Sequence, residues 1–275
     1  AAGLFGARLY ATIPASPAMN AAMSDDPILF SRDGHIARIT LNNPAQHNAL
    51  GAAEIGRFRD CLDAVETDPS LRVLLLTGNG ERTFCAGASL KQFRSGDMSG
   101  ELFSTLTDRL AALPIPSVCA LNGNVFGGGA EIALCCDYRI GVDDLRLLVP
   151  AARIGICYPL NGLQRYVDKL GLGAAKRILV ASEELAAETL LAIGFLHRVV
   201  ARERLDAESD AFARHLAGLA PLAVRAMKQI LGGIARGDLD SAGAARLVQQ
   251  CTQSRDLQEG LAAQREKRAP RFTGE

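Results

Sequence analysis

The chain has 275 residues, of which 48% are hydrophobic, enough for one large domain, or for a domain with a smaller appendage. Its 30 basic and 30 acidic residues give a formal net charge of zero. This balance argues against nucleic-acid binding as the main task, because proteins that rely on phosphate contacts usually carry a basic excess. No apolar run reaches the ~18 residues of a membrane span, so we expect no membrane contact.

Cysteine usage and the N-terminal composition both bear on where the protein works. The seven cysteines show no CxxC spacing and lie mostly in apolar runs. They predict small buried side chains in a reducing compartment, and neither a disulfide framework nor a metal site. Residues 1–24 are Ala-rich and lack the basic start and long apolar centre of a signal peptide. We therefore expect a cytoplasmic protein whose residues 1–24 form an N-terminal extension without a function.

Short strands and helices alternate over the first part of the chain. Apolar runs and turn residues predict strands at 35–44, 71–80, 117–123, 138–141 and 145–149, and helical spacing predicts helices at 50–66 and 101–116. From Gly162 onward the pattern is almost wholly helical, with two long helices expected at 219–234 and 241–268. This order indicates an α/β layer followed by a helical C-terminal part.

Three glycines open an apolar helix in "VFGGGAEIALCCD" (125–137), and Glu131 lies in its first turn. A helix N-terminus exposes unpaired N–H groups and a partial positive charge, and glycine lets a ligand approach the backbone closely. The stretch therefore favours an anion, or an oxygen that becomes negative during a reaction. Its spacing fits neither the P-loop nor the dinucleotide-binding fingerprint.

A second loop of small residues, "FCAGASLK" (84–91), closely follows the strand expected at 71–80. Strand ends on one side of an α/β sheet can bring two such loops together. Two backbone N–H donors from separate loops would then form an oxyanion hole, in which one donor contributes roughly 3 kcal/mol of barrier lowering. The alternative is that both loops are only tight turns that allow close packing of helix on sheet.

Several longer stretches resemble one known family. "FCAGASLKQF", "ALNGNVFGGGAEIALCCDYRIG" and "PAARIGICYPLNGLQRYVDKLG" are similar, in this order, to motifs of the enoyl-CoA hydratase/isomerase family, also called the crotonase family. "ITLNNPAQHNAL" (39–50) and "EGLAAQREKRAPRF" (259–272) resemble the ends of that family. The resemblance covers about residues 27–272.

The resemblance implies an α/β fold of the crotonase type, a spiral of ββα units over residues 25–200 that carries an acyl-CoA site. A C-terminal helical region, residues 201–275, would build a homotrimer, often paired into a homohexamer. The substrate would be an acyl-CoA thioester. Coenzyme A would enter as part of that substrate, with no permanently bound cofactor.

The resemblance also implies roles for individual residues. The backbone N–H groups of Ala88 and Gly128 would hold the thioester oxygen while an enolate develops. Glu131 matches the first of two glutamates that hydratases of the family use as acid and base. The residues expected along the CoA and acyl path are Ala88, Ser89, Leu90, Lys91, Gly128 and Lys267, the last reaching the CoA from a neighbouring helix or subunit.

The sequence departs from the family at two places. Ala151 stands where hydratases have their second glutamate, and Ser89 stands where the family has an aspartate. Loss of one proton-transfer group slows a reaction by roughly 10²–10⁴-fold, so we expect standard hydration to be slow. Tyr158 either donates a proton or binds a water in place of that glutamate, or it packs as a core or rim aromatic. His47 either lies near the CoA or is a surface residue.

Two classes of function follow from these observations. The first is an enzyme on acyl-CoA thioesters: a hydratase or isomerase, or a decarboxylase or carbon–carbon lyase that needs only the oxyanion hole and Glu131. The second is a non-catalytic acyl-CoA-binding protein that has lost the acid/base pair. A serine hydrolase would need a serine at the start of the glycine helix, and residues 126–131 contain none.

Overall fold

The structure, a computed structural model, describes residues 25–275, and the extension expected at 1–24 lies outside this range. Within it the strands form two sheets. The large sheet has the strand order β1-β2-β3-β5-β7-β10 and consists of β1 (Ile28–Asp33), β2 (Ile36–Leu41), β3 (Val73–Gly78), β5 (Ser117–Leu121), β7 (Tyr138–Val142) and β10 (Arg198–Val200). The small sheet consists of β4 (Thr83–Cys85), β6 (Asn124–Phe126), β8 (Arg146–Leu148) and β9 (Leu185–Ala186).

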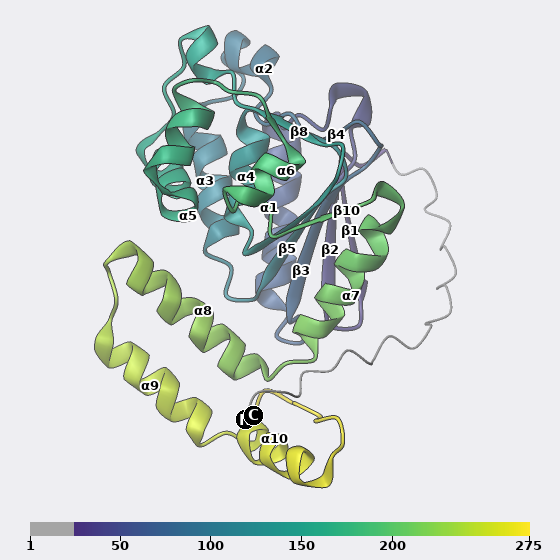
Figure 1. Ribbon diagram of the computed structural model, residues 1–275, viewed down its shortest axis with the longest axis vertical. Helices are drawn as coiled ribbons and strands as arrows, with labels where there is room; N and C mark the ends of the chain where they lie inside the picture. The colour runs from purple at the N-terminus through teal and green to yellow at the C-terminus, as the bar shows by residue number, and fades with distance from the viewer. Residues whose placement is uncertain (1–24) are drawn as a thin grey trace.

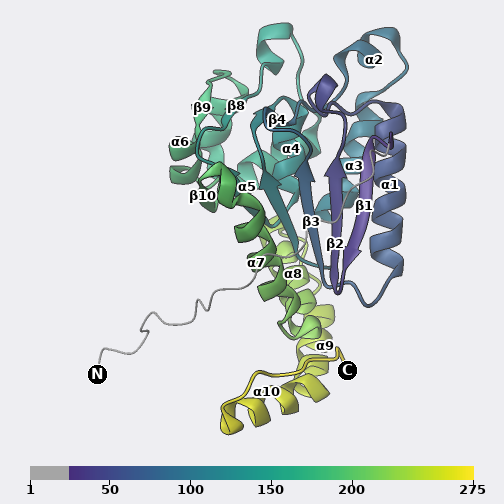
Figure 2. The same cartoon turned by 90° about the vertical axis from the view of Figure 1, so that its right-hand side faces the viewer.

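The large sheet is parallel from β2 to β10, and only β1 pairs antiparallel, with β2. Its central strand β3 reads VLLLTG, and residues 73–76 are completely buried. A strand covered on both faces is expected to be continuously apolar, as this one is. Helix α7 (Leu205–Ala217) packs against β2, β3, β5 and β7, and Figures 1 and 2 show α1 (Ala52–Thr67) and α3 (Gly100–Ala111) on the other side.

One unit of secondary structure occurs three times along the chain. Strands β3, β5 and β7 of the large sheet are each followed by a short strand of the small sheet, β4, β6 and β8, which pair parallel with one another. Each pair then leads into helices: α2 (Leu90–Ser95) and α3, then the buried α4 (Gly128–Cys135), then α5 (Leu160–Leu179), which is kinked at Gly171. This is the spiral of ββα units expected from the sequence (Figure 1).

The remaining short elements complete the body. Helix α6 (Ala187–Ala192) follows β9, and three 3₁₀ helices, η1 (Pro44–Gln46), η2 (Ala151–Ile154) and η3 (Arg202–Arg204), lie in connections. The expectation of an almost wholly helical chain after Gly162 is wrong at β9 and β10. These strands have two and three residues, too few for an alternating pattern to be recognised.

Three C-terminal helices extend from the body as an arm: α8 (Pro221–Arg236), α9 (Ser241–Thr252) and α10 (Arg255–Glu266) (Figures 1 and 2). The Lys228 ammonium fixes α8 to the body by donating to the Asp137 carboxylate at 2.6 Å and to the Ile115 carbonyl at 2.7 Å. The single long helix expected at 241–268 is wrong. The Ser254 hydroxyl instead accepts a hydrogen bond from the Leu257 N–H at 3.1 Å and begins α10 as its N-cap.

No helix among residues 25–275 combines the length and apolar character needed to cross a membrane. The division into a core at 25–200 and a helical region at 201–275 stays a prediction. By its contacts α7 covers the large sheet, while α8, α9 and α10 form the arm.

Candidate active site

Helix α4 begins with backbone groups that have no partner inside the helix. Gly127, the residue before it, has φ 51° and ψ −126°, and its N–H donates to the Leu148 carbonyl of β8 at 3.0 Å. Such a positive φ favours glycine, since a side chain would be strained there. Gly128 and Gly129 then form the first turn, where N–H groups lack intrahelical acceptors.

The loop after β4 lies directly against this helix start. A Cβ atom added to Gly87 would lie 2.3 Å from the Gly128 nitrogen, and one added to Gly129 would lie 2.2 Å from the Cys85 carbonyl oxygen. Both distances are far below van der Waals contact, so only glycine fits at either position. The two small-residue loops are therefore in backbone contact; this contact fits both sequence interpretations, and the oxyanion hole stays a prediction.

Ala88 points its N–H toward the same place. Leu50 forms a parallel bridge with Ala88, in which the Leu50 N–H donates to the Gly87 carbonyl at 2.7 Å and the Leu50 carbonyl accepts from the Ser89 N–H at 2.8 Å. In a parallel bridge the flanking residues make the bonds, so the N–H of Ala88 points away from Leu50. A Cβ atom on Gly128 would lie 3.4 Å from the Ala88 nitrogen.

Glu131 is buried one turn into α4, and its two carboxylate oxygens differ. Oε1 accepts hydrogen bonds from the Thr107 hydroxyl at 3.0 Å and from Arg165 Nη1 at 2.6 Å. Oε2 accepts none from the residues that the structure describes. A Cβ atom on Gly162 would lie 3.1 Å from Oε2, so the missing side chain of Gly162 leaves space in front of this oxygen. One oxygen is held and the other is open.

Burial sets the acidity of this carboxyl group. It raises the pKa of Glu131 above its ordinary value, the nearby charge of Arg165 and the hydrogen bond from Thr107 lower it, and the charge of Asp108 raises it. The net direction is upward, which brings the group toward the range in which a carboxylate both accepts and returns a proton. A buried carboxyl group on the same helix start as Gly128, with the Ala88 nitrogen close by, is an arrangement suited to chemistry at a carbonyl compound.

Comparison with known proteins agrees with this geometry. The model of the family described as enoyl-CoA hydratase/isomerase matches residues 31–275. The chain belongs to the enoyl-CoA hydratase/isomerase family. It is 33% identical to a putative enoyl-CoA hydratase/isomerase, YngF, of Bacillus subtilis, over 90% of this chain and 99% of that protein. It is 30% identical to a short-chain-enoyl-CoA hydratase of Clostridium acetobutylicum, over 88% and 95% of the two chains.

Solved structures give the same result for the fold. A crystal structure described as an enoyl-CoA hydratase/carnithine racemase from Magnetospirillum magneticum superposes with a TM-score of 0.86 at 31% identity, covering 92% of this chain and 97% of that one. The protein therefore has the α/β crotonase fold, with two sheets and C-terminal helices, and it is an acyl-CoA enzyme of this family.

Ala151 stands where the sequence resemblance places the second hydratase glutamate, and its methyl group cannot transfer a proton. Ala151 is buried at the start of η2, and the neighbouring Arg153 donates to the Ser182 carbonyl at 2.5 Å. Tyr158 lies in the following turn, with its ring edge-on to Tyr166 at 6.2 Å between centroids. Burial raises the pKa of Tyr158 above its usual range, so its phenol stays protonated. A proton-donating role for Tyr158 stays a prediction.

The residues expected along the CoA path fall into two groups. Ser89 is the N-cap of α2, accepting a hydrogen bond from the Gln92 N–H at 3.4 Å, and the next residues, Leu90 and Lys91, are exposed beside it. Ala88 lies beside Gly128, and Ser89–Lys91 follow it directly in the chain. Lys267 instead caps the end of α10 on the arm, at the opposite end of the molecule from α2 (Figure 1).

His47 is exposed beside a cavity of about 370 Å³. Its Nδ1 lies 2.9 Å from the Thr83 hydroxyl, and Arg82, Asp144 and Arg202 are among the other residues around the cavity. Asp144, exposed in its turn, pairs with Arg202 at 2.6 Å. Whether His47 contacts the CoA stays a prediction.

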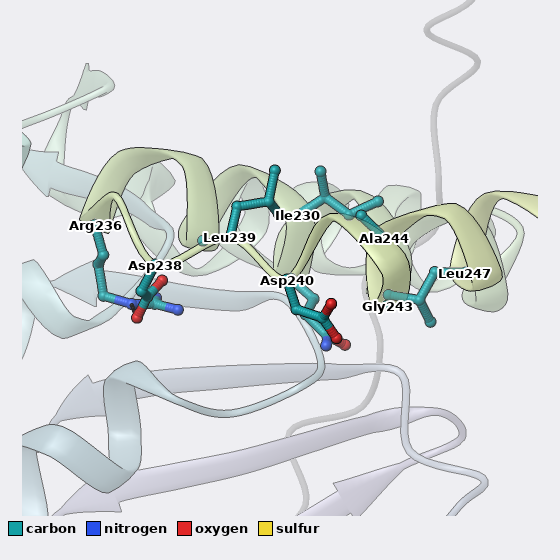
Figure 3. Close-up of a pocket in the computed structure, with 10 residues that line it drawn as sticks. Ile230, Arg236, Asp238, Leu239, Asp240, Gly243, Ala244 and Leu247 are labelled. Atoms are coloured by element: carbon teal, nitrogen blue, oxygen red, sulfur yellow. Dashed lines mark hydrogen bonds and ion pairs between the residues drawn. The ribbon is translucent and has the colours of Figure 1, made fainter.

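A groove of about 150 Å³ lies between α8 and α9, and Figure 3 shows the Arg236–Asp238 ion pair at one end of its lining, beside Ile230, Leu239, Ala244 and Leu247. None of the residues around Ala88, Gly128 and Glu131 lines this groove. It is a packing gap within the arm and not part of the active site.

Three residues of the site were not expected from the sequence: Thr107, Gly162 and Arg165. Arg165 and Gly162 lie in "NGLQR", inside a stretch that resembles the family, so their place near the site was within reach of the sequence. Their contact with Glu131 could not be predicted from the sequence. It joins α5 to α4, and Arg165 and Glu131 are 34 residues apart in the chain.

The contact between the two loops can be tested by replacing Gly87 with Ala. Gly87 has φ +78° and no room for a Cβ, whereas Gly194 has φ +76° and open space around it. Gly194→Ala should cost only the backbone strain, roughly 1–2 kcal/mol. Gly87→Ala should lower the free energy of unfolding, measured in urea, by clearly more than Gly194→Ala does. It should also abolish turnover of acyl-CoA substrates. Equal losses in both variants would show that the contact is absent.

The open side of Glu131 can be tested by Gly162→Ala. The added methyl group would lie 3.1 Å from Oε2 and 3.2 Å from Oε1, so it covers the carboxylate or displaces it. We expect turnover to fall by about 10²-fold, the order that a misplaced catalytic group costs. The helix preference of alanine over glycine, about 1 kcal/mol, offsets part of the cost of moving the carboxylate, so stability should change much less than turnover. The control is Gly56→Ala in α1, where the methyl group meets open space; full activity of Gly162→Ala would contradict the assignment.

Proposed function

We propose that this enzyme binds the thioester carbonyl oxygen of an acyl-CoA between the N–H groups of Ala88 and Gly128, and uses Glu131 as its only carboxylate acid/base. The observation that carries the proposal is the backbone contact between the loop at Gly87 and the helix start at Gly128, with Glu131 one turn further along. Donors held by two packed loops are in place before negative charge develops, which is the condition for strong oxyanion stabilisation.

The mechanism divides between backbone and side chain. The two N–H groups stabilise the enolate oxygen, whichever bond at the substrate is made or broken. In hydration, Oε2 of Glu131 would accept a proton from the water that adds to the β-carbon, and the α-carbon would then take up a proton. Ala151 supplies no carboxylate for that second transfer, so we propose that hydration is slow and that the natural reaction needs one carboxylate only.

The remaining parts of the substrate site are proposals of the same kind. Ser89, Leu90 and Lys91 would line the CoA and acyl path beside Ala88, and Lys267 would reach the CoA of a neighbouring subunit. Coenzyme A would enter as part of the substrate, with no permanently bound cofactor. A cytoplasmic location also stays a prediction.

Ala151 favours a second candidate function, decarboxylation or carbon–carbon cleavage on the same scaffold. Both reactions generate an enolate without removing a proton from the α-carbon. The oxyanion hole would therefore supply most of the transition-state stabilisation, and Glu131 would contribute less. A protein that only binds acyl-CoA is also consistent with Ala151. The buried, hydrogen-bonded Glu131 argues against it, because a pure binder gains nothing from the cost of burying a carboxylate.

The proposal is tested by following the loss of the conjugated-enoyl absorbance of crotonyl-CoA in three proteins. Wild type should turn over slowly, Glu131→Gln should be slower by about 10²–10⁴-fold, and Ala151→Glu should be faster than wild type because it restores the second acid/base group. All three should bind CoA thioesters equally. If Glu131→Gln retains the wild-type rate, Glu131 is not the acid/base. If all three are inert but bind, decarboxylation or cleavage becomes the leading function.

We also propose that the arm builds a homotrimer, which pairs into a homohexamer or stays single. Three large apolar side chains on α8, Met227, Leu231 and Ile234, are 56%, 65% and 58% exposed. Their spacing places them on one face of the helix. An apolar stripe of this kind on a projecting helix is typical of an association surface.

Sedimentation of the wild-type protein should therefore give a trimer or hexamer, and Leu231→Glu should shift it toward monomer, because a charge in an apolar interface is costly to desolvate. Leu191→Glu on α6, where the leucine is also exposed, is the control and should leave the assembly unchanged. A monomeric wild-type protein would contradict the proposed homotrimer or homohexamer, and it would leave the proposed reaction chemistry unaffected.

A further inference from the structure

Arg165 connects Glu131 to a second carboxylate outside the site. Its Nη1 donates to Glu131 Oε1 at 2.6 Å, and its Nη2 donates to Asp108 Oδ1 at 2.8 Å. The side chains of Arg165 and Glu131 are 10% and 5% exposed, whereas that of Asp108 is 51% exposed. The guanidinium thus bridges an inner carboxylate on α4 and an outer one on α3.

The bridge is itself held in place. The Asn161 amide donates to both oxygens of Asp108 at 2.8 and 2.7 Å, and its own oxygen accepts from the Gly162 N–H at 2.9 Å. Asn161, Gly162 and Arg165 all belong to the first turns of α5. Three helices therefore meet at one connected set of hydrogen bonds, with Glu131 at its buried end.

We propose that Arg165 is a positioning residue for Glu131, which fixes the orientation of the carboxylate and favours its charged form, and that Asp108 moderates this effect from outside. The inference rests on the proposed function, in which Glu131 is the acid/base. Arg165 and Thr107 both bind Oε1, so the carboxylate has one orientation and presents Oε2 to the open side.

The charge surroundings agree with this role. The groups that face Glu131 are Arg165 on α5, Asp108 on α3, the thiol of Cys135 on α4, and the phenols of Tyr158 and Tyr166. Burial raises the pKa of both phenols and of the thiol, so all three stay neutral near pH 7. Arg165 is the one cation in this set and Asp108 the one other anion.

The consequence concerns the direction of proton transfer. In a site with two carboxylates, their repulsion favours a proton on one of them. In this chain Ala151 removes the second carboxylate, and the charge of Arg165 opposes the rise in the Glu131 pKa that burial causes, so Arg165 favours the charged form as the starting state of the reaction. The reaction then starts with Glu131 accepting a proton, from water or from a carbon of the substrate, and Glu131 later returns that proton to a carbon or to solvent.

The experiment measures kcat/KM against pH for wild type, Arg165→Gln, Asp108→Asn and Glu131→Gln, on whichever enoyl-CoA the wild type turns over. Since the charged form is the active one, the rate falls as the pH drops through the pKa of Glu131. Removing the Arg165 cation raises that pKa, so the acid limb should move to higher pH, with a loss of up to about 10²-fold in rate from misorientation. Removing the Asp108 anion lowers the pKa, so the acid limb should move to lower pH.

Opposite shifts in the two variants would support the proposal, because a merely structural role would lower the rate in both without moving the limb. Arg165→Lys should restore the wild-type limb in part. If Arg165→Gln fails to fold, the pH profile of Asp108→Asn still tests the proposal. Asp108 is half-exposed, so it can be changed while the Arg165–Glu131 ion pair stays in place. An unmoved limb in both variants, with Glu131→Gln inactive, would overturn the inference alone. A Glu131→Gln protein with the wild-type rate would overturn the proposed function instead.

Discussion

The close approach of two backbones, at Gly87 and Gly128, is the constraint on which the rest of the site depends. A side chain at either Gly87 or Gly129 would overlap main-chain atoms of the other loop. The ββα spiral makes this approach possible, because β4 and β6 are paired neighbours and both loops leave the same edge of the small sheet. The fold therefore serves the site by bringing two chain segments about forty residues apart into register, as the pairing of Cys85 with Val125 shows.

The Glu131–Arg165 pair is the second element, and its energetics are a balance of opposing terms. Burying two charges costs several kcal/mol each, and their attraction together with the added hydrogen bonds offsets that cost only when the geometry is good. Here the pair is short and Thr107 adds a further donor. Replacing such a pair by well-packed apolar residues is often neutral or stabilising, so stability alone does not account for it. A role in proton transfer gives a reason for its presence.

Sequence reasoning went furthest where the signal is local. The buried strand at 73–78, the glycine-opened helix and Glu131 in its first turn follow from runs of a few residues whose physical meaning is direct. It went less far where structure depends on distant partners. Strands of two or three residues, such as β9, exist only because a neighbour pairs with them, and Ser254 ends one helix and begins another inside a continuous helical pattern. The contact of Arg165 with Glu131 likewise exists only in the folded chain.

The backbone N–H groups and the proton-transferring side chains of the proposed site respond differently to substitution. This difference bears on what Ala151 would change. An oxyanion hole made of backbone N–H groups survives most side-chain changes, provided that the glycines stay. Proton transfer depends on single side chains and is lost or redirected by one substitution. Under the proposed function, a chain that keeps Gly87, Gly128 and Glu131 but has Ala151 would retain enolate stabilisation and would lack one of two proton routes. Chemistry that forms an enolate and moves one proton is the class that such a site still accelerates.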